Sequence, residues 1–141
     1  MPTWKLLLIV IPVVALIDLL YLGVIAKSFY DAEVGDLARR SSGAFAPRWG
    51  PAIAVYLLIP AGIVLFVRPA MGPNAQLWQA ALWGALFGLV LYGTYDFTNR
   101  CILEKWSLRL TLADIAWGCV LCGLGASIMW LAERWLGSRG A

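Results

Sequence analysis

Long runs of hydrophobic residues alternate with shorter polar segments along the whole chain. Four of these runs, at about residues 4–26, 51–67, 77–98 and 112–136, contain very few charged side chains. A helix needs about 20 mostly apolar residues to cross the hydrocarbon core of a bilayer, and each run is close to that length. The pattern therefore predicts an all-α membrane protein, built as a bundle of four transmembrane helices.

The polar segment after the first run has a helical pattern of its own. Tyr30, Val34 and Leu37 recur at a spacing of three or four residues, and most of the positions between them are acidic, basic or small. This pattern is typical of an amphipathic helix that lies in the plane of the lipid headgroups. We therefore expect an interfacial helix at about residues 28–40, ended by the Ser-Ser-Gly sequence at 41–43.

The composition agrees with a single integral membrane domain that covers residues 1–141. Of these residues, 62% are hydrophobic and 13% are charged, whereas soluble domains carry about 25% charged residues. The 11 Lys and Arg residues are too few and too scattered for a nucleic-acid groove, so membrane lipids are the expected partners. The chain has no histidine, which removes the usual general base and the usual transition-metal ligand.

The basic residues are distributed unevenly between the two membrane faces. The segments after the first and third runs carry seven of them: Lys27, Arg39, Arg40, Arg48, Arg100, Lys105 and Arg109. The opposite face carries four: Lys5, Arg68, Arg134 and Arg139. Because basic residues are enriched in cytoplasmic loops, we expect both termini outside and the two larger loops in the cytoplasm.

Three aspartates lie within or at the ends of the hydrophobic runs. Asp18 and Asp96 lie toward the ends of the first and third runs, which cross the membrane in the same direction. Asp114 lies near the start of the fourth run, which crosses back. All three are therefore expected in one leaflet. A charged side chain costs about 2.5–3.5 kcal/mol at the centre of a span, so these acids should be protonated, paired or bound to a cation.

Functional and structural interpretations of the three acids are both open. As a pocket, they can hold a polar headgroup, a proton, or a hard divalent cation through their oxygen atoms. As a structural feature, they can form ion pairs with nearby basic residues: Lys27, Arg48, Arg100 and Arg109. Thr111 and Asp114 also have the spacing of a helix-capping box, with Thr111 as the N-cap residue.

Polar and aromatic residues close to the acids in helical space complete the candidate pocket. They are Tyr21, Tyr92, Tyr95, Asn99, Arg100 and Trp117. The aromatic belt at a membrane interface explains the aromatic members equally well, and no catalytic residue can be assigned among them. Four small residues are expected to pack helices closely together: Gly84, Gly88, Gly118 and Cys122.

Three motifs and one loop carry a resemblance to a known family. The motifs are Asp18-Leu-Leu-Tyr21-Leu-Gly23, Tyr95-Asp96-Phe97-Thr98-Asn99 and Leu112-Ala-Asp114-Ile-Ala-Trp117-Gly118, and the loop contains Lys105-Trp106. With these motifs the chain resembles domain of unknown function family 2177, whose members are small bacterial membrane proteins. The resemblance implies four helices in a bacterial inner membrane and a connection with lipids, but it implies no established activity. Tyr21 stands where the family pattern has a tryptophan.

Three functions are compatible with these observations. The leading hypothesis is a protein that binds, or also modifies, a lipid at a cytoplasmic-leaflet pocket built on the three aspartates. One alternative is a proton- or cation-coupled carrier of a small solute that works as a dimer. The other alternative is a non-catalytic subunit of a larger membrane complex. Four short spans enclose little space, so we expect the chain to form a homo-oligomer or to join such a complex.

Overall fold

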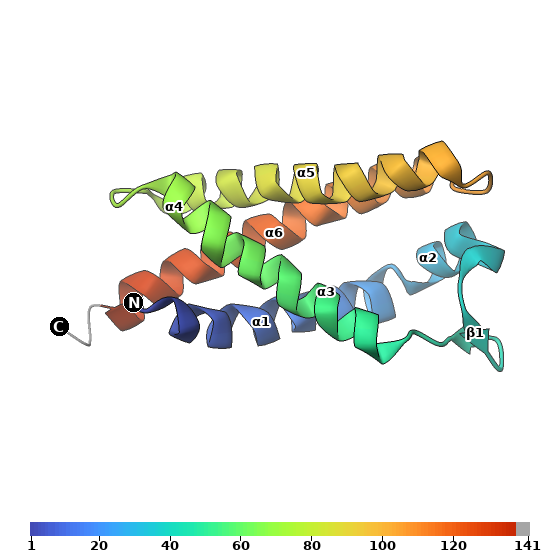
Figure 1. Ribbon diagram of the computed structural model, residues 1–141, viewed down its shortest axis with the longest axis horizontal. Helices are drawn as coiled ribbons and strands as arrows, with labels where there is room; N and C mark the ends of the chain where they lie inside the picture. Colours follow the sequence, from blue (N-terminus) through green and yellow to red (C-terminus); the bar gives the residue numbers. More distant parts are fainter. Residues whose placement is uncertain (138–141) are drawn as a thin grey trace.

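Four long helices form a bundle in the computed structural model, which describes residues 1–137 (Figure 1). Each helix is long and apolar enough to cross a membrane. The four spans are Thr3–Ile25, Trp49–Met71, Leu77–Ile102 and Leu108–Gly137. The predicted all-α membrane bundle is therefore confirmed. Arg139, one of the basic residues assigned to the face of the termini, lies outside the described residues.

The first two spans are not regular α-helices throughout. The first consists of α1 (Thr3–Leu20) and the π-helical turn η1 (Tyr21–Ile25), and the second of α3 (Trp49–Gly62), the π-helical turn η3 (Ile63–Val67) and α4 (Arg68–Met71). Pro60 lies just before η3 and has no backbone N–H, so it disturbs the regular hydrogen-bond pattern at this point. The turn η1 begins three residues after Asp18, which places irregular backbone next to the candidate pocket.

The last two spans, α5 (Leu77–Ile102) and α6 (Leu108–Gly137), are regular and longer than predicted. Helix α6 begins four residues before the predicted position because Ser107 caps it: the Ser107 hydroxyl accepts a hydrogen bond from the Leu110 amide at 3.0 Å. Thr111 therefore lies inside the helix, where its hydroxyl donates to the Ser107 carbonyl at 3.0 Å. The capping box predicted for Thr111 and Asp114 is wrong.

The connection between the first two spans begins with the predicted interfacial helix and continues as a hairpin. Helix α2 (Lys27–Val34) is shorter than predicted because Gly35 takes a positive φ of 51°, and a short 3₁₀ turn, η2 (Gly35–Leu37), follows. Strands β1 (Arg40–Ser41) and β2 (Ala44–Phe45) then pair in antiparallel register. Ser42 and Gly43 between them both have positive φ, as a two-residue hairpin turn requires.

Helices α5 and α6 pack very closely because small residues face each other across the contact. A Cβ atom added at Gly84 would collide with the Cys122 carbonyl, and one added at Gly88 would collide with the Gly118 carbonyl. Gly118 itself lies against the Tyr92 ring. This small-residue contact holds the two helices that carry Asp96 and Asp114 at a fixed distance.

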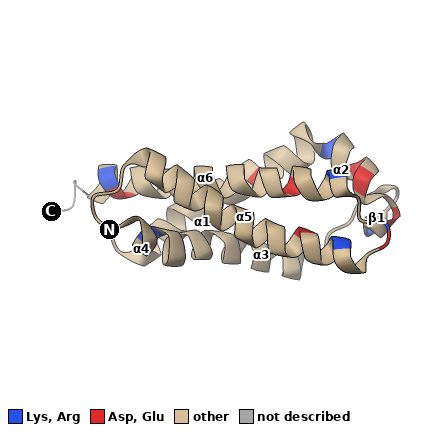
Figure 2. Ribbon diagram, turned by 90° about the horizontal axis from the view of Figure 1, so that it is seen from above, with Lys and Arg blue, Asp and Glu red and all other residues tan. Residues whose placement is uncertain are grey.

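Helix α6 lies at the centre of the bundle and packs on α5, α1 and η3. On the side away from α5, α6 contributes to an apolar core of buried side chains. Val10 and Val14 of α1 and Ile63 of η3 pack there with Leu121 and Met129 of α6. The outer faces of the spans expose large apolar side chains, as contact with lipid requires. Most charged residues lie at the two ends of the bundle (Figure 2).

Candidate functional site

The three aspartates lie at a similar depth in the bundle, near the end that carries α2 and the hairpin. Asp96 is six residues before the end of α5, and Asp114 is six residues after the start of α6. Each is thus about 9 Å along its helix from that end. Asp18 lies seven residues before the end of the first span. The structure brings them to the same end of the bundle.

Asp18 is held between two helices by neutral hydrogen-bond donors. Its side chain is only 5% exposed. One carboxyl oxygen accepts a bond from the Trp117 indole N–H at 2.8 Å, and the other accepts one from the Tyr56 hydroxyl at 3.0 Å. Tyr21 stacks on the Trp117 ring at 3.6 Å between ring centroids, so the aromatic side chain after Asp18 orients the indole that binds it.

Asp114 accepts a hydrogen bond from a residue that lies outside the four spans. The Tyr30 hydroxyl in α2 donates to an Asp114 oxygen at 2.5 Å. Burial of the Tyr30 side chain, followed by this hydrogen bond, raises the pKa of its hydroxyl, so Tyr30 stays protonated and keeps its donor. The Tyr30 and Tyr21 rings also pack edge-on, with 6.0 Å between their centroids. A continuous chain of contacts thus links Asp114, through Tyr30 and Tyr21, to the Trp117 indole that binds Asp18.

Asp96 is completely buried, and within the described residues neither of its oxygens has a hydrogen-bond partner. It interacts electrostatically with Asp114 on the neighbouring helix. The indole N–H of Trp106 is near Asp96 and is also buried without a partner in the described part of the chain. Most buried polar groups in proteins are hydrogen-bonded. Asp96 and the Trp106 indole are therefore a buried acceptor and donor that lie near each other without forming a hydrogen bond of normal geometry.

The remaining predicted pocket residues lie around this cluster without bonding to the acids. Tyr92 is half-buried against Gly118. Tyr95 is 56% exposed and contacts the Trp106 ring edge-on at 5.9 Å. Arg100 is exposed and donates to the Trp106 carbonyl at 2.7 Å, while Asn99 is half-buried near Tyr95. Their contacts shape the surroundings of Asp96 rather than bind it.

The predicted ion pairs of the three aspartates are not formed. The basic residues near them have other partners: Lys27 pairs with Asp31 at 2.7 Å, and Arg109 pairs with Glu33 at 3.5 Å. No salt bridge between described residues includes Asp18, Asp96 or Asp114. The structural interpretation as ion pairs is therefore wrong. Over residues 1–137, the acidic and cysteine side chains also form no group of three that could hold a metal ion.

Residues 3–131 match the protein family described as predicted membrane protein, DUF2177. The chain belongs to this family. Neither a curated protein nor a solved structure matches it. The DUF2177 match contains all three aspartates together with Tyr30, which binds one of them. It ends before Glu133, so the last turns of α6 lie beyond it.

Three members of the site were not assigned to the predicted pocket: Tyr30 and Tyr56 lie outside the DUF2177 motifs, and Trp106 lies within the Lys105-Trp106 part of the resemblance. Tyr30 follows the apolar face of α2, Tyr56 lies early in α3, and Trp106 lies in the loop before α6. Each is an aromatic residue near a membrane interface, where the aromatic belt is a sufficient explanation. The only available signal was their position in the same leaflet as the acids.

Proposed function

We propose that the chain binds a membrane lipid through its headgroup, at the end of the bundle that carries the three aspartates. The supporting observation is that every hydrogen-bond partner of these acids within residues 1–137 is a neutral tyrosine or tryptophan. An acid that is paired with arginine has its charge balanced by the protein. An acid with neutral donors remains able to bind an ammonium or hydroxyl group that a ligand brings.

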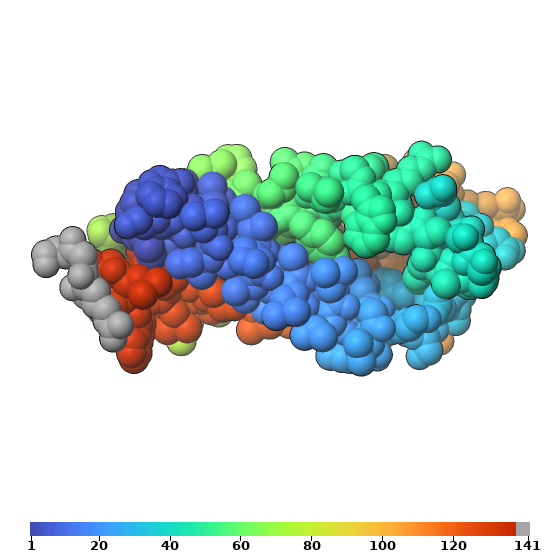
Figure 3. Space-filling view, turned by 90° about the horizontal axis from the view of Figure 1, so that it is seen from below, coloured from blue at the N-terminus to red at the C-terminus, as the bar shows by residue number. Residues whose placement is uncertain are grey.

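The surroundings of the cluster favour a lipid as that ligand. In the space-filling view, a recess separates α3 from the η1–α2 segment, and atoms of the second half of the chain are visible inside it (Figure 3). The side chains on both sides of this part of the bundle are largely apolar and exposed, including Ile25 and Ile53. A headgroup at the depth of Asp114 leaves its acyl chains against these faces, whereas a soluble ligand would have no such contact.

Two neighbouring carboxyl groups also supply a means of modifying the bound lipid. Asp96 and Asp114 lie on facing helices, close enough for their carboxyl groups to interact electrostatically. Close carboxyl pairs in apolar surroundings serve as general acid and base in several enzyme classes, because the two groups do not ionise together. If a reaction occurs at this site, we assign proton transfer to this pair.

The experiment uses the full chain and two lipids that differ in headgroup chemistry. Purified protein is titrated with phosphatidylethanolamine, which has an ammonium group, and phosphatidylglycerol, which has hydroxyls only, and bound lipid is counted by native mass spectrometry. We expect Asp96→Asn and Asp114→Asn each to reduce the bound phosphatidylethanolamine and to leave the bound phosphatidylglycerol unchanged. The matched control is Asp36→Asn, an acid 93% exposed on the same face. Binding of phosphatidylethanolamine that is unchanged in both aspartate variants would contradict the proposal.

The complete burial of Asp96 without a partner in the described part of the chain supports proton- or cation-coupled transport as a second candidate. A buried acid with no fixed partner can take up and release a proton or a cation during transport. This function predicts solute flux in proteoliposomes that depends on the pH gradient and is lost in Asp96→Asn. Solute flux that does not depend on the pH gradient would exclude this function. The homo-oligomer or larger complex expected from the sequence stays a prediction.

A further inference from the structure

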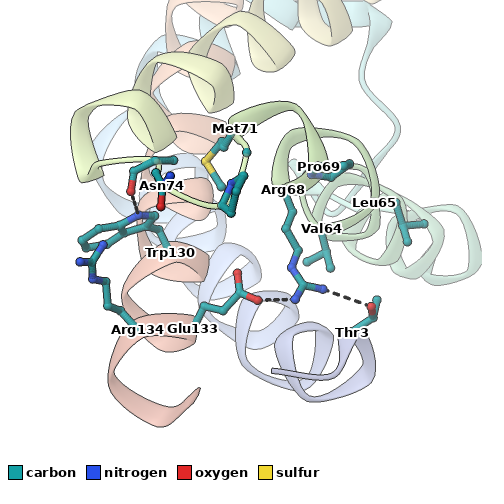
Figure 4. A pocket seen from close by; sticks show the side chains of 13 residues that line it. Thr3, Val64, Leu65, Arg68, Pro69, Met71, Asn74, Trp130, Glu133 and Arg134 are labelled. Carbon is teal, nitrogen blue, oxygen red and sulfur yellow. Dashed lines mark hydrogen bonds and ion pairs between the residues drawn. The ribbon is translucent and has the colours of Figure 1, made fainter. Parts of the chain in front are cut away.

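A cavity of about 850 Å³ lies at the end of the bundle opposite to the three aspartates. Its walls come from η3, α4, the turn between α4 and α5, and the last turns of α6 (Figure 4). Drug-sized and lipid-headgroup ligands occupy cavities of about 300–1,000 Å³. The acid cluster contributes no residue to this cavity, so a ligand bound here is independent of the lipid function proposed for the acids.

Two arginines and one glutamate set the charge of this cavity. Arg68 points between α6 and the start of α1, where it bonds to Glu133, to the Met1 carbonyl at 2.9 Å and to the Thr3 hydroxyl at 3.3 Å (Figure 4). The charge of Glu133 is balanced by Arg68 and by the N-terminal ammonium of Met1, which lies 3.5 Å from the Glu133 carboxylate. Arg134 is exposed at the rim and has no acidic partner among the described residues. The side chains that line the cavity thus leave one positive charge unbalanced.

The Arg134 guanidinium is held in place by an aromatic ring. It lies over the Trp130 ring at 5.0 Å from the centroid. The Trp130 indole N–H donates to the Ala75 carbonyl at 2.9 Å, which fixes the ring against the turn before α5. Asn74 in the same turn lines the cavity, and its side-chain amide makes no hydrogen bond within residues 1–137. The Arg134 guanidinium, which lies over the Trp130 ring, and the exposed Asn74 amide thus line the same cavity.

We infer that this cavity binds a phosphate-bearing anion. A guanidinium presents N–H groups in a planar arrangement that matches phosphate oxygens, and it does so with less loss of entropy when its position is already fixed. Val64, Leu65 and Met71 form apolar walls beside these donors, and tryptophan and arginine at a helix end are typical of the headgroup region. The phosphate is carried either by an anionic lipid or by a small soluble molecule.

The decisive variant is Arg134→Gln, because this side chain is exposed and its loss does not disturb the core. The chain offers a closely matched control in Lys5→Gln: Lys5 is exposed on the same membrane face and also lies over a tryptophan, Trp4, at 5.5 Å. It does not line this cavity. A basic side chain near the membrane surface contributes a factor of about five to anion binding. We expect Arg134→Gln to weaken binding about fivefold and Lys5→Gln to leave it unchanged.

The measurement uses the full-length protein with phosphatidylglycerol in native mass spectrometry, first alone and then with inorganic phosphate as competitor. A lipid headgroup is supported as the ligand if Arg134→Gln weakens the binding of phosphatidylglycerol and phosphate does not displace the bound lipid. Displacement by phosphate, with direct binding of phosphate that is lost in the same variant, supports a soluble phosphate compound. Binding that is insensitive to Arg134→Gln, or equally sensitive to Lys5→Gln, would overturn the inference, because it would reflect general surface charge.

Discussion

The contacts of Asp18 allow a quantitative test of the site by a double-mutant cycle. Asp18→Leu removes the carboxylate that accepts two hydrogen bonds and keeps a similar side-chain size, and Trp117→Phe removes the 2.8 Å donor while keeping an aromatic ring against Tyr21. If the bond forms, the changes in unfolding free energy caused by the two substitutions do not add up in the double variant, because either substitution alone already breaks the same bond. The cycle therefore isolates the Asp18–Trp117 bond from the other effects of each substitution.

The expected size of this coupling follows from the place of the bond. Interhelical side-chain hydrogen bonds in membrane proteins contribute about 0.6 kcal/mol on average and up to about 1.7 kcal/mol. The Asp18–Trp117 bond connects two helices, is short and involves a side chain only 5% exposed. An unsatisfied buried donor costs about 1–3 kcal/mol. We therefore expect a coupling in the upper half of the membrane range, at about 1–1.7 kcal/mol.

Equilibrium unfolding in mixed micelles measures the four free energies that the cycle requires. The same cycle with Tyr56→Phe tests the 3.0 Å bond on the other oxygen and should give a smaller coupling, since Tyr56 is half-buried. Asp36→Asn, whose side chain is 93% exposed, should leave the unfolding free energy unchanged. Additivity of Asp18→Leu and Trp117→Phe within about 0.3 kcal/mol would refute the bond and with it the placement of α1 against α6.

Three further predictions test other parts of the structure. Gly88→Ala places a Cβ against the Gly118 carbonyl and should lower the unfolding free energy by about 1–3 kcal/mol, whereas Gly93→Ala, which meets nothing within 4 Å, should not. Tyr30→Phe removes the donor to Asp114 and should speed amide hydrogen exchange in α2; unchanged exchange would contradict this contact. Cys101 is exposed at the α2 end of the bundle, so a membrane-impermeant maleimide should label it only from the cytoplasmic side. Labelling in intact cells would reverse the expected orientation.

The sequence was sufficient to predict the four spans and the common depth of the acids. Hydrophobic length determines where a helix can cross the membrane, and the alternation of direction then assigns Asp18, Asp96 and Asp114 to one leaflet. Depth along a helix follows from residue number alone. For this reason the predicted leaflet of the three acids agrees with their positions in the bundle.

The partners of the acids could not be predicted, because they depend on the rotation and crossing of the helices. The bonds of Asp18 reach residues 38 and 99 positions away, and that of Asp114 reaches across 84 positions. The spans are apolar on almost every side, so their sequences do not specify which face points inward. Charge was the most visible signal, and it suggested ion pairs with Lys27 and Arg109 that the structure replaces with other partners.

The absence of those ion pairs among the described residues decides what kind of site the cluster can be. An arginine next to Asp18 or Asp114 would balance its charge permanently, and a ligand would have to displace that arginine to bind. Tyrosine and tryptophan donors orient a carboxyl group without balancing it, so its response to a proton or an ammonium group is preserved. At the other end of the bundle, Arg68 and Glu133 do balance each other, and the charge that remains there is positive. On the two proposals above, the two ends of the bundle bind ligands of opposite charge, so exchanging the headgroup charge in the binding experiments should exchange the end that responds.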